Sequence, residues 1–104
     1  MISYNIDEYG QTIRVNIGQD VSAGTSFKMI LEPYSGDKVE VTATLGTSDT
    51  VVGDETFEAN KFVEYVTTSG VFPSGTAGKW RKKAVATLAS SKIASDYSLF
   101  RVTE

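Results

Sequence analysis

Hydrophobic and polar residues alternate along several short stretches of the chain, which is the pattern of β-strands with one buried face. The alternation is most regular over residues 39–45, where every second residue is apolar. Residues 13–17 and 27–31 show the same pattern, although Ile30 falls on the polar face of the second stretch. These stretches predict three strands. The core residues that we expect are Phe27 and Leu31 in residues 27–31 and Val41 in residues 39–45.

Turn-forming residues separate these strands. Pro33 and Gly36 lie between the second and third stretches, where proline fixes one backbone angle and glycine tolerates the unusual ones. A connection as short as this one is typical between two neighbouring antiparallel strands. Residues 26–45 are therefore predicted to form a β-hairpin.

The second half of the chain is less regular. Residues 62–66 have strong β propensity but apolar side chains on both faces, which indicates a strand that is covered on both sides or borders a contact. Residues 67–76 form the longest loop candidate. Its apolar residues, Val71 and Phe72, either cap the core or face a partner.

Residues 78–88 predict a long strand. Trp80, Ala84, Ala86 and Leu88 share one face, and Lys82 is the only polar residue among them. A helix over residues 79–92 is the alternative, but the apolar residues form no stripe with a 3.6-residue period. We interpret Trp80 as a core residue, because one indole buries on the order of 200 Å².

A last strand is predicted over residues 97–103, which brings the expected number to about seven. Short strands separated by turns are typical of β-sandwiches. With 104 residues and 40% hydrophobic content, the chain is long and apolar enough for one core. We therefore predict a single all-β domain over residues 1–104, an immunoglobulin-like antiparallel β-sandwich.

The chain contains neither cysteine nor histidine. The commonest general base at neutral pH, thiolate nucleophiles and the usual transition-metal ligands are therefore missing. The acids around Gly53 lack the spacing of a calcium-binding loop, and two short motifs, residues 35–38 and 75–79, match acylating and phosphate-binding signatures only in part. We predict a protein that is not an enzyme, with no catalytic residue, metal site or cofactor.

Neither a membrane nor nucleic acid is an expected partner. The longest candidate, the apolar run of residues 29–31, is far shorter than the ~20 residues that span a bilayer. The first residues show no basic segment followed by an apolar run, so we expect synthesis in the cytoplasm. A net charge of −3 argues against general affinity for nucleic acid.

Charge is unevenly distributed along the sequence. Residues 1–75 carry a net charge of −7 and residues 76–104 a net charge of +4. On a strand, Lys79, Arg81 and Lys83 would project from one face. That face is either a solvated surface or a protein contact, in which case Val71 and Phe72 are the candidate apolar centre.

Three segments together resemble a known class of proteins. Residues 13–27 combine a strand with a polar turn that contains Asp and Ser, residues 31–37 hold a Pro-x-x-Gly-Asp turn, and residues 78–81 begin with Gly-x-Trp. In this order they resemble small immunoglobulin-like structural proteins of tailed bacteriophages, including the domains that begin baseplate and tail-fibre proteins. The likeness covers most of the chain.

The resemblance implies a virion structural protein, an adaptor or decoration module that docks on a head or tail assembly. Its partners would be other virion proteins or copies of itself, and it would be oligomeric in the assembled particle. The alternative function is a carbohydrate-binding module, in which sugars stack on exposed aromatic rings. The candidate platforms are Trp80, Tyr4, Tyr9 and Tyr34.

Overall fold

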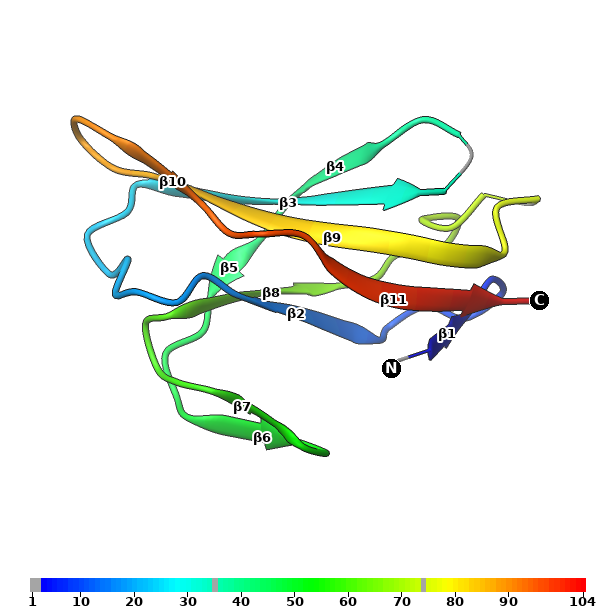
Figure 1. Ribbon diagram of the computed structural model, residues 1–104, viewed down its shortest axis with the longest axis horizontal. Helices are drawn as coiled ribbons and strands as arrows, with labels where there is room; N and C mark the ends of the chain where they lie inside the picture. Colours follow the sequence, from blue (N-terminus) through cyan, green and yellow to red (C-terminus); the bar gives the residue numbers. More distant parts are fainter. Residues whose placement is uncertain (1–2, 35, 74) are drawn as a thin grey trace.

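The computed structural model describes residues 3–34, 36–73 and 75–104, and these residues form strands and no helix (Figure 1). Accordingly, no helix in the described part of the chain is long and apolar enough to span a membrane. The all-β prediction is confirmed. In chain order the strands are β1 (Ser3–Asn5), β2 (Thr12–Asn16), β3 (Ser26–Pro33), β4 (Val39–Thr42), β5 (Thr44–Leu45), β6 (Thr50–Val52), β7 (Glu55–Phe57), β8 (Phe62–Val66), β9 (Gly78–Thr87), β10 (Lys92–Ala94) and β11 (Ser98–Thr103).

The strands form two packed sheets and a separate hairpin. The larger sheet has the order β1-β11-β9-β3-β4, and β10 also pairs with β9; the smaller sheet has the order β2-β8-β5. These pairings are antiparallel except that between β1 and β11. In immunoglobulin terms, β2, β8 and β5 take the places of strands B, E and D, and β11, β9 and β3 those of G, F and C. The predicted sandwich is thus confirmed, with β6 and β7 as an additional hairpin between D and E.

The predicted hairpin over residues 26–45 is correct only in its first part. Strands β3 and β4 pair from Leu31 opposite Val39 to Lys28 opposite Thr42. The chain then crosses to the smaller sheet at the buried Ala43, and β5 pairs with β8. Apolar residues continue to alternate across this crossing because both sheets face the same core, so the pattern does not reveal the break.

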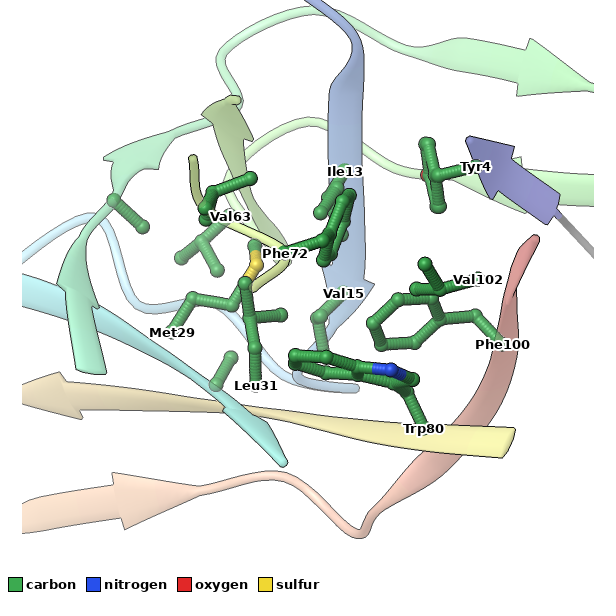
Figure 2. Close-up of a cluster of buried hydrophobic side chains, with 13 residues drawn as sticks. Tyr4, Ile13, Val15, Met29, Leu31, Val63, Phe72, Trp80, Phe100 and Val102 are labelled. Carbon is green, nitrogen blue, oxygen red and sulfur yellow. The ribbon is translucent and has the colours of Figure 1, made fainter. Parts of the chain in front are cut away.

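The core lies between the two sheets and is centred on aromatic rings (Figure 2). Trp80 is only 1% exposed, and its ring centroid lies 5.3 Å from that of Phe72 and 5.8 Å from that of Phe100. The indole N–H donates a hydrogen bond to the carbonyl of Thr76 at 2.6 Å. Leu31 is fully buried, whereas Phe27 and Val41 are partly buried and pack against the cluster. The four predicted core residues all contact this core.

Val71 and Phe72 also belong to the core, which confirms the first of the two alternatives for this loop; the second, that they form the apolar centre of a partner contact, is wrong. Phe72 is 2% exposed, and its ring packs against those of Tyr4, Trp80 and Phe100. The loop between β8 and β9 folds back so that these side chains cap the sandwich. Loops have no periodicity from which the buried positions can be read.

A second cluster holds the β6–β7 hairpin against the smaller sheet. Val63 faces the core, so Phe62 points to the opposite face of β8, where its ring lies 5.4 Å from that of Phe57 in β7. Both rings are buried. Gly46 makes room for them, since a Cβ atom there would lie 2.0 Å from the Phe62 ring. The expectation that residues 62–66 are covered on both sides is confirmed for Phe62 and Val63.

Side chains of the larger sheet seal the free edge of β2. Backbone groups in an antiparallel strand alternate in direction, and the carbonyls of Thr12 and Arg14 point away from β8. The Tyr4 hydroxyl donates to the first at 3.2 Å, and the Lys82 ammonium donates to the second at 2.9 Å. The bond from Lys82 explains why a lysine stands among the apolar residues of β9. Together the two bonds cover backbone groups at an edge that could otherwise pair with another strand.

Burial of the two side chains changes how they titrate. Desolvation raises the pKa of Tyr4 to about 12, against a smaller lowering by the nearby Arg14. Desolvation also lowers the pKa of Lys82, which is 4% exposed, against a smaller opposing effect of Glu55. The folded state therefore tolerates the Lys82 charge less well than the unfolded chain does.

Replacement of Trp80 by alanine should destabilise the fold strongly. We expect Trp80→Ala to lower the free energy of unfolding by about 3 to 5 kcal/mol, because it removes the ring around which the core packs. Leu99→Ala is the control: Leu99 is 57% exposed, and we expect a change within about 0.5 kcal/mol. Urea denaturation measures both values. A loss below about 1 kcal/mol for Trp80→Ala would contradict its central position in the core.

Lys82 should make the free energy of unfolding depend on pH in the alkaline range. Because its pKa is lowered in the folded state, the folded protein releases this proton before the unfolded chain does. The free energy of unfolding should therefore rise, relative to that of Lys82→Met, as the pH increases from the lowered pKa towards 10.5, the ordinary lysine value.

Denaturation curves at stepped pH measure this difference. The exposed Lys38→Met is the control and should follow the wild-type protein at every pH. A constant difference between the wild-type protein and Lys82→Met from neutral pH to 10.5 would show that the Lys82 amine titrates normally.

Candidate functional site

The outer face of the larger sheet collects the predicted basic residues. Trp80 and Lys82 point inward, so Lys79, Arg81 and Lys83 project from the opposite face of β9. Lys79 and Arg81 are exposed, and Lys83 is half-buried. The prediction that strand geometry places the three cations on one face is confirmed.

The neighbouring strand β11 adds two residues that sequence reasoning did not single out. Leu99 lies opposite Arg81, and Arg101 lies opposite Lys79. Both are exposed, because Phe100 and Val102 take the inward positions. The alternation of residues 98–103 predicts their outward orientation, but only the strand order shows that they adjoin the cations of β9. We call Lys79, Arg81, Lys83, Leu99 and Arg101 together the basic face.

Two of these cations already have partners within the molecule. Arg81 forms an ion pair with Glu32, which lies opposite it in β3. The Arg81 guanidinium also lies 4.0 Å from the centroid of the Tyr97 ring, and the Lys83 ammonium lies 5.1 Å from the same centroid. Such cation–π contacts contribute about 0.5–1 kcal/mol at exposed sites. They hold the middle of the basic face in a defined arrangement.

Lys79 and Arg101 form the uncompensated end of the basic face. They are directly opposite each other, and no carboxylate in the described part of the chain lies within 4.0 Å of their charged groups. Like charges in such a pair destabilise a sheet. This end of the face therefore presents positive charge that a partner with acidic groups would neutralise.

Two shallow hollows open beside Lys79. One, of about 580 Å³, is lined by Glu32, Pro33, Tyr34, Gly36, Lys79, Trp80, Arg81 and Leu99. A second, of about 420 Å³, shares Tyr34 and Lys79 with the first. Tyr34 is 91% exposed. The basic face thus borders an exposed tyrosine and contains an exposed leucine, and neither contributes to the core.

The structure narrows the candidates for a carbohydrate platform. Trp80 and Tyr4 lie in the core, so neither ring can stack on a sugar. Tyr9 and Tyr34 are exposed, and Tyr34 lines both hollows.

The remaining motifs are accounted for by local structure. Asp49 accepts a hydrogen bond from the backbone N–H of Ala59 at 2.8 Å, and Glu58 forms an ion pair with Lys61. The described residues contain no group of three or more acids that could hold a metal ion. Strand β9 begins at Gly78, within residues 75–79, where a phosphate loop requires a helix to follow. Ser35 of the 35–38 motif lies outside the described residues.

No family model, curated protein or solved structure matches this chain. Its function is therefore inferred from the chemistry of its own surface.

The like charges of Lys79 and Arg101 should lower the free energy of unfolding. Reversing one of them in Arg101→Glu places a carboxylate opposite Lys79, and we expect the free energy of unfolding to rise by about 0.5 kcal/mol. The double variant Lys79→Glu/Arg101→Glu restores a like-charge pair and should unfold near the wild-type value. Urea denaturation at low salt measures both. A single variant less stable than the wild-type protein would show that the two charges do not interact unfavourably.

Proposed function

We propose that the protein is a non-enzymatic assembly module that docks on other proteins through the basic face. More specifically, we propose a structural protein of a tailed bacteriophage virion, an adaptor or decoration module on the head or tail. The observation that carries the proposal is the uncompensated pair Lys79 and Arg101 beside the exposed side chains of Leu99 and Tyr34.

This combination suits a protein contact. Affinity at protein interfaces comes from a few apolar and aromatic anchors, whereas charges at the rim guide association and fix orientation. Leu99 and Tyr34 supply the anchors, in the place that Val71 and Phe72 were expected to take. Lys79 and Arg101 supply the charge, and the rigid sheet beneath requires little ordering on binding.

A protein partner is favoured over nucleic acid. Affinity for nucleic acid grows with the number of phosphates that cations neutralise. Here Arg81 is already paired with Glu32, and Glu40 adds a second acid on the same face of the sheet, paired with Lys28. The net charge of −3 would also oppose a phosphate backbone.

The virion assignment is supported by the resemblance of residues 13–27, 31–37 and 78–81 to phage structural proteins and by the sandwich fold. The absence of histidine and cysteine, which leaves no common nucleophile–base pair, agrees with a structural role. In this role the partners are other virion proteins or further copies of the chain.

Incorporation into particles tests the proposal. Phage particles purified from cells that express the chain should contain it in a fixed copy number, as measured by quantitative mass spectrometry. The variant Lys79→Glu/Arg81→Glu/Lys83→Glu should remain folded, because all three side chains lie outside the core, but should be depleted from particles. Lys38→Glu/Lys92→Glu, at exposed positions outside the basic face, is the control and should be incorporated normally.

Three outcomes contradict the proposal: particles without the chain, normal incorporation of the triple variant, or equal loss of the control. Binding of a glycan that Tyr34→Ala abolishes, together with absence from particles, would instead support the carbohydrate-binding alternative.

A further inference from the structure

One continuous surface connects the basic face with the tip of the β6–β7 hairpin. A hollow of about 470 Å³ is lined by the hairpin residues Val52, Gly53, Asp54 and Glu55 together with Lys82, Ser98 and Leu99. Leu99 also lines the 580 Å³ hollow beside Lys79 and Arg81. The side chain of Leu99 therefore lies where the two regions meet.

The two ends of this surface carry opposite charges. Asp54 and Glu55 are exposed at the hairpin tip, and residues 49–58 contain four acids and no base. Lys79 and Arg101 are exposed at the other end, and no carboxylate in the described part of the chain lies within 4.0 Å of their charged groups. Two apolar side chains lie between the ends, Leu99 and Val52, and both expose more than a third of their surface.

Such a surface is complementary to a copy of itself. In a two-fold dimer each residue contact is made twice, with the roles of the copies exchanged. A two-fold axis near Leu99 places the acidic tip of each copy over the basic end of the other, and it brings the two apolar centres together. We propose that the chain forms a two-fold homodimer through this surface. The dimer rests on the proposed use of the basic face as a protein contact.

The hairpin is built to present its tip in a fixed position. The Phe57–Phe62 pair anchors its base, and the side-chain amide of Asn16 donates to the carbonyl of Thr56 at 3.3 Å. Beyond this anchor the hairpin is exposed, and Figure 1 shows β6 and β7 below the smaller sheet. Little conformational entropy is then lost when the tip docks, which favours association.

A second copy is the occupant that the observations favour, because both halves of the required complementarity occur on this chain. An unrelated acidic protein would satisfy Lys79 and Arg101 but would leave the acidic tip beside it without a partner. The dimer satisfies both ends and covers Leu99 and Val52.

Charge reversal at each end tests the dimer. The first variant, Lys79→Glu/Arg101→Glu, has two acidic ends, and the second, Asp54→Lys/Glu55→Lys, has two basic ends. Each should dimerise at least about tenfold more weakly than the wild-type protein, because like charges now face each other. An equimolar mixture should form a heterodimer, since every contact is again between opposite charges. Sedimentation velocity measures the dissociation constants, and circular dichroism checks the fold.

The expected signature is specific to this arrangement. Wild-type dimerisation should weaken as salt rises from about 0.01 M to about 1 M, over which the screening length falls from about 30 Å to about 3 Å. Leu99→Ser should weaken the dimer at every salt concentration, since it removes an apolar contact. The matched control Lys38→Glu/Lys92→Glu changes the net charge as much as the first variant does and should dimerise like the wild-type protein.

A wild-type protein that stays monomeric up to about 1 mM at low salt overturns the dimer. So does a mixture of the two folded variants that forms no heterodimer, and Asp54→Lys alone repeats the second test if the double variant misfolds. These results are independent of the particle experiment. Depletion of the triple variant from particles without any dimer would support the proposed function alone.

Discussion

Burial of the Trp80 ring fixes the orientation of β9. The packing of the core and the residues on the outer face of the larger sheet both depend on this orientation. Side chains alternate strictly along a strand, so a shift of one residue would turn every side chain of β9 to the other face. With Trp80 inward among Phe72 and Phe100, Lys82 is also directed inward, where it meets the free edge of β2. The same alternation places Lys79, Arg81 and Lys83 in solvent or near it. The inward orientation of Trp80 thus determines both the residues of the core and those of the candidate contact surface.

Much of the sandwich could be predicted because its main strands follow this period of two. Residues 39–45 show where the period is insufficient: the pattern continues through Ala43, although the chain changes sheets there. Strands β1, β6, β7 and β10 have three residues each, too few for an alternation to stand out. The burial of Val71 and Phe72 depends on how a loop folds back, and no local signal encodes that path.

The part of the candidate site that lies on β9 could be predicted from the sequence, whereas the residues that neighbouring strands contribute could not. The three cations of β9 follow from alternation alone. Arg101, Leu99 and Glu32 join them only because β11 and β3 flank β9, and strand order is a property of the whole chain. Adjacency in sequence to Lys79 therefore favours Val71 and Phe72 as exposed apolar neighbours of the cations, whereas the exposed leucine beside them, Leu99, belongs to β11, about twenty residues after Lys79.

The attachment of the β6–β7 hairpin has a consequence for how the protein can diversify. The Phe57–Phe62 pair fills the space beside Gly46, so a side chain at position 46 would collide with the Phe62 ring and displace the pair that anchors the hairpin. Residues 51–56 beyond that pair are exposed and contribute nothing to the central core. Substitutions at the tip can therefore accumulate, or a different loop can be grafted there, without changing the folding of the domain. The sequence of the hairpin tip can thus change as long as Gly46 and the two phenylalanines are kept.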